Sequence, residues 1–119
     1  QLAEQRGEQF GRALEHFILM ELVAYRSLSE LDYEISFWRT KSGLEVDFIL
    51  GEGEIAVEVK GTSRVDSRDL RGLSAFADEF SPKQAIVVCS EKQERVIGPI
   101  RIMPWRVFLK KLWEGSVIR

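Results

Sequence analysis

The alternation of apolar and polar residues is clearest between Glu45 and Gly61. Two short alternating runs flank a Gly-Glu-Gly turn at 51–53, and this arrangement predicts a β-hairpin. Successive side chains of a strand point to opposite faces. In the first run we therefore expect one face to carry Val46, Phe48 and Leu50, and the other to carry Glu45, Asp47 and Ile49.

The second run places a carboxylate and a lysine two residues apart. We expect its apolar face to carry Ile55, Val57 and Val59, and its other face to carry Ala56, Glu58 and Lys60. If the polar faces of the two strands coincide, Asp47, Glu58 and Lys60 lie on one patch of sheet, which predicts a divalent-metal site with a cation beside it. Each motif alone also has a structural interpretation. Glu-x-Lys is a common surface pair, and an aspartate keeps an edge strand soluble.

Periodicity and turn residues predict the remaining elements. Apolar residues recur at helical spacing between 4 and 25, and the range 33–40 is rich in residues that favour a strand. Downstream we expect a helix from Asp66 or Ser67 to about Phe80, a buried strand at 85–89, a short strand within 96–102 interrupted by Gly98-Pro99, and a helix from Pro104 to Trp113. This order predicts an α/β sandwich with one mixed sheet flanked by helices.

Glu15 stands out in the first predicted helix because its helical row is otherwise small or apolar. The row consists of Gly11, Glu15, Ile18 and Leu22. We expect this carboxylate to be partly buried, and buried carboxylates need a partner or a metal ion. For Glu15 alone, the simpler interpretation is a residue at the edge of the buried stripe whose tip reaches solvent.

Composition narrows the class of protein. The 119 residues are 45% hydrophobic and 30% charged, which favours one compact globular domain. No apolar run is long enough to span a bilayer, and no secretory signal is recognisable. The single cysteine, Cys89, excludes an internal disulfide, so we expect a cytoplasmic location. Because the chain begins with Gln, we expect it to be a fragment of a longer protein.

The net charge of −2 argues against a domain that grips nucleic acid by bulk electrostatics, because each phosphate contact needs a Lys or Arg. It does not exclude an enzyme that holds metal with carboxylates, since bound cations cancel part of the negative charge.

Other candidate chemistry is weaker. His16 adjoins Glu15 on the predicted helix but points about a quarter-turn away, so we interpret it as a packing or surface residue. Cys89 lies in an apolar run and is interpreted as an inert core thiol. No Gly-x-Ser-x-Gly sequence and no second histidine supports a hydrolase triad. The last helix is expected to dock through Trp105, Phe108, Leu109 and Leu112.

The order of Glu15 on a helix, Asp47 on a strand and Glu58-Val59-Lys60 on the next strand resembles the PD-(D/E)XK, or restriction-endonuclease-like, nuclease fold, with its αβββαβ core. The resemblance is closer to a branch that follows AAA-type P-loop ATPases in longer proteins. The segments that carry it are 11–18, 38–40, 43–49, 57–60, 73–76 and 104–109. The ATPase motif Gly-x-x-x-x-Gly-Lys-[Ser/Thr] does not occur in this chain.

The resemblance implies metal-dependent cleavage of phosphodiester bonds in DNA. It implies that Asp47 and Glu58 hold Mg²⁺, or Mn²⁺, together with the backbone carbonyl of Val59. Glu15 would complete the ligands or orient a bound water, and Lys60 would stabilise developing negative charge. Residues 1–119 would form one domain, the C-terminal part of an ATPase-containing protein. Its partners would be DNA and that ATPase domain, with no membrane, and two copies can pair in several enzymes of this fold.

Two features depart from the resemblance. Val46 precedes Asp47 where the name of the fold has Pro, and the second helix offers Arg68, Arg71 and Ser74 where many nuclease branches carry Gln, Lys or Tyr near the metal. We interpret the two arginines as solvated surface. The alternative function is a non-catalytic module of the same fold that recognises nucleic acid or a protein partner, because a fold alone does not establish an activity.

Overall fold

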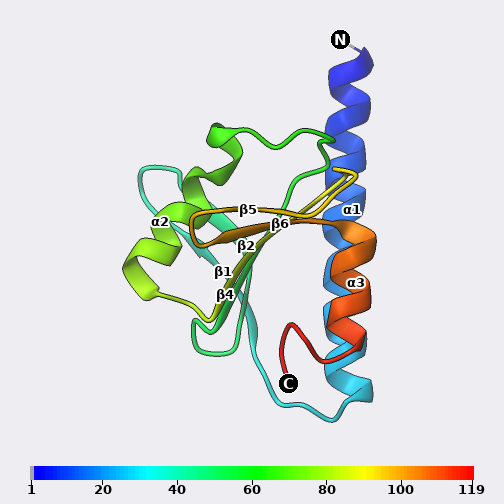
Figure 1. The fold of residues 1–119 in the computed structure, drawn as a ribbon, viewed down its shortest axis with the longest axis vertical. Coiled ribbons are helices and arrows are strands. Elements are labelled where there is room, and N and C mark those ends of the chain that lie inside the picture. The colour runs from blue at the N-terminus through cyan, green and yellow to red at the C-terminus, as the bar shows by residue number, and fades with distance from the viewer. Residues whose placement is uncertain (1) are drawn as a thin grey trace.

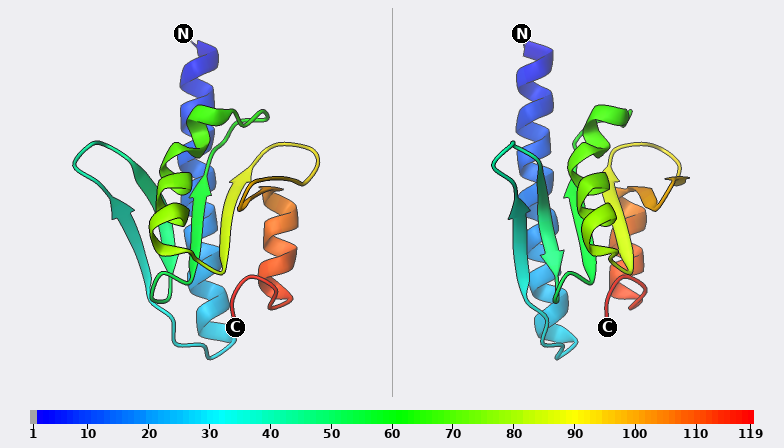
Figure 2. Two further views of the ribbon diagram at one scale, coloured as in Figure 1. Left: turned by 60° about the vertical axis from the view of Figure 1, so that its left-hand side comes forward. Right: turned by 90° about the vertical axis from the view of Figure 1, so that its left-hand side faces the viewer.

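The computed structural model describes the backbone of residues 2–119 and the side chains of residues 6–119. A six-stranded sheet separates α2 (Arg71–Phe80) on one face from α1 (Leu2–Leu28) and α3 (Trp105–Trp113) on the other, which makes three layers (Figure 1). The two views of Figure 2 show α1 and α3 behind the sheet and α2 in front of it. The expected α/β sandwich is therefore confirmed.

The sheet is mixed, with strand order β1-β2-β3-β4-β6-β5. β3, β4 and β6 run parallel, whereas β1, β2 and β5 are antiparallel to their neighbours. The first helix, three strands, a second helix and a fourth strand follow one another as αβββαβ, as expected. The strand bounds are β1 Ile35–Arg39, β2 Glu45–Leu50, β3 Ile55–Val59, β4 Gln84–Cys89, β5 Arg95–Ile97 and β6 Ile100–Pro104.

Two apolar clusters hold the layers together, one on each face of the sheet. The α1 and α3 side includes Leu14, Ile18 and Leu22 of α1 and Phe108 and Leu112 of α3. The docking face expected for the last helix is thus confirmed. The burial of a large apolar side chain contributes about 1.5–3 kcal/mol, so these clusters supply the main stabilisation of the fold.

The hairpin of β2 and β3 is confirmed, but the predicted alternation along β2 is wrong at one position. Ser36 pairs with Ile49 and Trp38 pairs with Val46, so Phe37 alone faces both residues 47 and 48. This two-for-one pairing is a β-bulge, and it bends a strand and re-aims its side chains. As a result Val46 joins Ile49 in the apolar cluster under α2, on the opposite side from Phe48.

Two further differences concern the second half of the chain. The segment expected to be one interrupted strand forms two, β5 and β6, with Ile97 pairing Ile100 across a Gly98-Pro99 turn. Gly98 has φ +56°, which favours glycine at this turn. Pro104 ends β6 and precedes α3 instead of lying in its first turn.

The second helix begins with a short 3₁₀ turn, η1 (Ser67–Leu70), which leads directly into α2. Asp66, one of the two expected caps, accepts hydrogen bonds from the backbone N–H groups of Arg68 and Asp69, and the Asp69 side chain accepts one from the Asp66 N–H. This capping box satisfies donors that would otherwise lack partners. Within the described residues, no helix is both long and apolar enough to cross a membrane.

Candidate active site

Asp47 and Glu58 interlock across the hairpin. The N–H of Asp47 donates to Glu58 Oε1 at 3.0 Å, and the N–H of Val59 donates to Asp47 Oδ2 at 2.8 Å. Each carboxylate is thus held by the backbone of the other strand through one oxygen. The structure brings together the two carboxylates that sequence analysis placed on one patch of sheet, and it leaves Asp47 Oδ1 outside this pair of hydrogen bonds.

The interlock lies where the regular ladder of β2 and β3 ends, next to the bulge between β1 and β2. In a regular ladder, the backbone N–H of a strand residue points to its neighbour's carbonyl rather than to a side chain. The register of β2 and β3 is regular only from the pairing of Phe48 with Val57 onward. Next to the bulge, the N–H groups of Asp47 and Val59 donate to side-chain carboxylates instead.

Two glycines allow the helices to approach this end of the hairpin. A Cβ added at Gly61 would lie 2.8 Å from the Cα of Gly11, so α1 presses against the chain just beyond β3. A Cβ added at Gly72 would collide with the carbonyl oxygen of Glu45, so α2 presses against the start of β2. Such close approaches require residues without a side chain. The two contacts bring both helical layers to the same end of the hairpin.

Lys60 lies beside Glu58, with its Nζ 3.4 Å from Glu58 Oε2. The two side chains differ in burial, since that of Glu58 is 6% exposed and that of Lys60 is 37% exposed. Lys60 follows the last residue of β3, and its N–H donates to the carbonyl of Val88 in β4. The ammonium group can therefore reach solvent while it compensates part of the charge of Glu58.

Glu15 is half-buried on α1, next to the row that packs against the sheet. It lines one cavity of about 360 Å³ together with Asp47 and Phe48, and a second hollow of about 980 Å³ together with Lys60. Glu15 therefore lines both openings. The expectation of a partly buried carboxylate is confirmed.

All three carboxylates have raised pKa values, and burial is the largest cause for each. Burial, followed by the charge of Asp47, raises the pKa of Glu58 to about 8. Burial also raises the pKa of Asp47, although the hydrogen bond from Val59 acts in the opposite direction. Burial and the charge of Asp47 raise the pKa of Glu15, while Lys60 lowers it. Desolvation and like charge thus exceed the compensation from Lys60, and a further cation would stabilise all three carboxylates.

The donor set fits a hard cation such as Mg²⁺. Oxygen ligands suit this ion, and it is commonly held by one or two carboxylates while it keeps several waters. Among residues 6–119, no three His, Cys, Asp or Glu side chains lie close enough to form a complete protein cage. Asp47 and Glu58 are the two carboxylates that could hold the ion. The role of Glu15 toward a bound water stays a prediction. The role of the Val59 carbonyl stays a prediction.

The other residues singled out from the sequence form no hydrogen bond or ion pair with Asp47, Glu58 or Lys60 among the described residues. Arg71 is exposed, as expected, and His16 and Ser74 are exposed as well. Cys89 is fully buried, and burial raises the pKa of its thiol, which agrees with an inert core position. Arg68 is also exposed and pairs with Asp66 at 3.3 Å.

Several residues around the larger hollow were not predicted from the sequence. Arg12 and Thr62 line it with Arg68, next to Lys60. In the sequence, Arg12 is marked only by its position one residue after Gly11. In the structure, Gly11 contacts Gly61, and this contact fixes that part of α1 against the sheet. Nothing in the local sequence of Thr62 indicated its position.

The chain belongs to the family described as a domain of unknown function (DUF4143), which it matches over residues 10–108. The matched range contains Glu15, Asp47, Glu58 and Lys60, all six strands and the start of α3. No curated protein and no solved structure matches the chain.

Proposed function

We propose that this DUF4143 domain is a metal-dependent nuclease that hydrolyses phosphodiester bonds in DNA and acts together with an ATPase domain of the same protein. One observation carries the proposal. Two carboxylates interlock at a strand bulge, their pKa values are raised, and a half-exposed lysine lies beside them. Perturbed carboxylates next to a cation and an open cavity are typical of functional sites.

Each residue has a distinct proposed role. Asp47 and Glu58 would hold Mg²⁺ or Mn²⁺, with the Val59 carbonyl as a further oxygen ligand. Glu15 would orient the attacking water, because it lines the same cavity as Asp47. Lys60 would stabilise the negative charge that develops on the phosphoryl oxygens, because its ammonium group is already at the carboxylates and reaches solvent.

The bound ion would supply positive charge for the transition state and lower the pKa of a bound water. Hydrolysis adds the oxygen of water to phosphorus, breaks one phosphorus–oxygen ester bond, and delivers a proton to the departing oxygen. The chain supplies the orientation of the water through Glu15 and charge stabilisation through Lys60.

Calorimetric titration with Mn²⁺ tests the metal site first. We expect the natural sequence to bind the ion and an Asp47→Ala/Glu58→Ala variant not to bind it. The matched control is Asp78→Ala/Glu79→Ala, which removes the same two charges from exposed positions on α2 and should leave binding unchanged. Equal binding by all three proteins would contradict the assignment of Asp47 and Glu58.

Cleavage of supercoiled and linear DNA in Mg²⁺ tests the reaction itself. We expect Lys60→Ala to abolish cleavage with little loss of stability, because its side chain is more than one-third exposed. A large loss of stability would identify Lys60 as part of a structural ion pair instead.

The second candidate function is a non-catalytic module that recognises nucleic acid or a protein partner. It is supported by the lack of a third metal-ligating side chain within reach among residues 6–119. Metal binding without cleavage of any DNA tested, together with retained DNA binding, would favour this module over the nuclease.

A further inference from the structure

A second cleft lies where the chain leaves β3 and β4. It encloses about 590 Å³ and is lined by two loops, one following each strand. Because β3 and β4 are parallel, their carboxyl ends meet at one edge of the sheet, where ligands commonly bind in sheets of this kind. The lining residues are Ser63, Arg64, Val65, Ser90, Glu91, Lys92 and Arg95.

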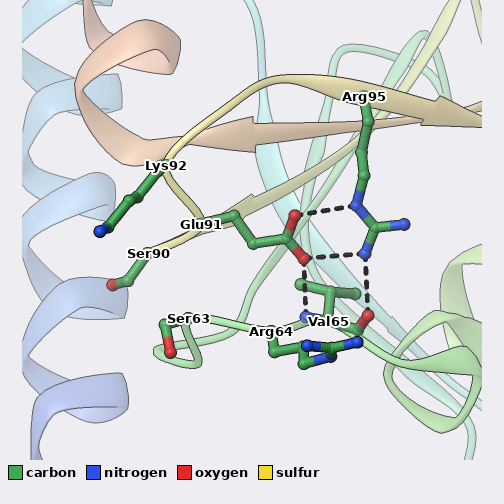
Figure 3. Close-up of a pocket in the computed structure, with 7 residues that line it drawn as sticks. All are labelled: Ser63, Arg64, Val65, Ser90, Glu91, Lys92 and Arg95. Carbon is green, nitrogen blue, oxygen red and sulfur yellow. Dashed lines mark hydrogen bonds and ion pairs between the residues drawn. The ribbon is translucent and has the colours of Figure 1, made fainter.

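One carboxylate of the cleft is already satisfied (Figure 3). Arg95 donates two hydrogen bonds of 2.8 Å to Glu91, and the N–H of Val65 donates a third at 2.7 Å. Arg95 also donates to the carbonyl of Val65 at 2.9 Å. These contacts lower the pKa of Glu91, chiefly through the hydrogen bonds from Arg95. The network joins the two loops and neutralises the only carboxylate that lines the cleft.

The remaining polar groups of the cleft are donors without acceptors. Arg64 and Lys92 are exposed, and neither forms an ion pair with another side chain in the range 6–119. The hydroxyl oxygen of Ser90 is buried and lacks a hydrogen-bond partner among those residues. Figure 3 shows Ser63, Ser90 and Lys92 on one side of the network, joined to it by no dashed line.

The loop that carries Arg64 is held in a fixed conformation. The hydroxyl of Thr62 accepts from the N–H of Arg64 at 3.0 Å and donates to its carbonyl at 3.1 Å. The N–H of Ser90 donates to the carbonyl of Thr62 at 2.9 Å, which fixes the spacing of the two loops. A preorganised loop loses less conformational entropy when a ligand binds.

The cleft and the candidate active site are neighbours along the chain. Thr62 lines the hollow beside Lys60, and Ser63 begins the lining of the cleft. The cleft carries three cationic side chains against one carboxylate, although the whole chain has a net charge of −2. Positive charge is therefore concentrated beside the carboxylates of the hairpin.

We infer that this cleft binds two neighbouring phosphodiester groups of a nucleic-acid strand, next to the group that lies at Asp47 and Glu58. Lys92 and the hydroxyls of Ser63 and Ser90, which lie on one side of the network, contact one phosphate, and Arg64, which lies apart from them, contacts the other (Figure 3). Such contacts position a strand without reading its sequence. The choice of nucleic acid as the source of the phosphate rests on the proposed function.

Fluorescence anisotropy of a short labelled DNA strand and of its duplex, measured in EDTA, tests the inference without any reaction. We expect Arg64→Ala/Lys92→Ala to weaken binding about tenfold and to reduce the slope of log K against log salt by about 2, as two lost phosphate contacts require. Inorganic phosphate should compete with DNA for the natural sequence, and this competition should weaken in Arg64→Ala/Lys92→Ala. Ser90→Ala should weaken binding by a smaller factor.

The matched control is Lys83→Ala/Arg119→Ala, which removes an equal charge near the opposite end of β4. It should leave both the affinity and the salt slope as they are in the natural sequence. If the two double variants weaken binding equally, the effect is one of total charge and the inference is wrong. An unchanged salt slope in Arg64→Ala/Lys92→Ala would also overturn it.

Cleavage assays on the same DNA separate this inference from the proposed function. Binding that depends on Arg64 and Lys92, without cleavage in Mg²⁺, supports the cleft and contradicts the nuclease. Cleavage whose substrate affinity is unaffected by Arg64→Ala/Lys92→Ala supports the nuclease and overturns the cleft.

Discussion

Glu58 and Glu91 occupy comparable places in the fold but differ in how their charge is compensated. Glu58 belongs to the end of β3, and Glu91 follows the end of the parallel neighbour β4. Glu91 receives two hydrogen bonds from one arginine and a third from the backbone. Glu58 has one backbone hydrogen bond and a lysine at 3.4 Å, with Asp47 as a like-charged neighbour.

The difference separates a carboxylate whose charge is compensated from one whose charge is not. The pKa of Glu91 is lowered by its hydrogen bonds with Arg95, so its charge stabilises the fold. The pKa of Glu58 is raised to about 8 by burial and by Asp47, so its charge destabilises the fold unless a cation is added. Perturbed carboxylates beside an open cavity are typical of functional sites, which supports the role proposed for Glu58.

The largest expected effect concerns cleavage. Asp47→Ala, Glu58→Ala and the double variant should each lose cleavage by about 10³-fold or more, and by similar factors, because residues that act as a unit are not additive. Glu91→Gln should retain cleavage within about tenfold. Initial rates on plasmid DNA in Mg²⁺ give this comparison. Equal losses in Glu58→Ala and Glu91→Gln would break the distinction between the two carboxylates.

The next largest effect concerns stability against pH in EDTA. Because the folded-state pKa of Glu58 is raised to about 8, its protonated form stabilises the fold. This stabilisation is complete below the usual pKa of about 4.3 and is lost as the pH rises through about 8. We expect the free energy of unfolding to fall by up to about 5 kcal/mol over this window.

Urea unfolding at a series of pH values measures this slope. Glu58→Gln should flatten the slope, because the amide does not titrate. Glu91→Gln should leave the slope between pH 5 and 8 unchanged. Glu91 acts with the opposite sign, since its lowered pKa gives a stabilisation that is present above its usual pKa and lost as the pH falls through the lowered value. If the slope persists in Glu58→Gln, other titrating groups cause it.

A smaller effect is expected from removing the compensation of Glu91. Arg95→Ala leaves that carboxylate, whose side chain is 11% exposed, with only the N–H of Val65. The free energy of unfolding should fall by about 1–3 kcal/mol, as measured by urea unfolding near neutral pH. The control is Arg101→Ala, which removes an exposed pair with Glu94 and should cost less than about 1 kcal/mol. Equal costs would mean that the network of Figure 3 is an ordinary surface pair.

The smallest expected effect is a change in the pKa of Glu58 when Lys60 is replaced. Its charge lowers the pKa of Glu58, so Lys60→Met should move the titration of Glu58 to still higher pH. Carbon NMR of labelled glutamate side chains follows that titration directly. Lys92→Met, which removes a cation from the other cleft, should leave the titration of Glu58 in place, and a shift of equal size there would contradict a local effect.

Most of the fold could be predicted because periodicity reports which side chains are buried. The alternation on either side of the turn at 51–53 specified the hairpin, and the helical spacing of Phe108 and Leu112 specified how α3 docks. The bulge opposite Phe37 could not be predicted, since the residues at 47 and 48 carry no sequence signal for it. It follows instead from the pairing of two strands.

The candidate active site and the cationic cleft also differ in how far they could be predicted from the sequence. Asp47 and Glu58 lie on adjacent strands of one hairpin, so a local pattern could bring them together. Arg64 and Lys92 belong to loops that meet only because β3 and β4 are parallel neighbours joined through η1 and α2. Such long-range proximity leaves no spacing in the sequence, and the cationic cleft was therefore visible only in the structure.

The hairpin turn has a consequence for evolution and for engineering. The partnership of Asp47 and Glu58 is set by the bulge and by the ladder that begins with Phe48 and Val57, at the far end from the turn. Insertions within 51–53 would lengthen the loop without rotating either carboxylate, whereas deletion of a single residue at 47 or 48 would. Homologues can therefore diverge in the number of residues between the two acids while they keep the site, and the turn offers a tolerant location for a grafted tag or reporter.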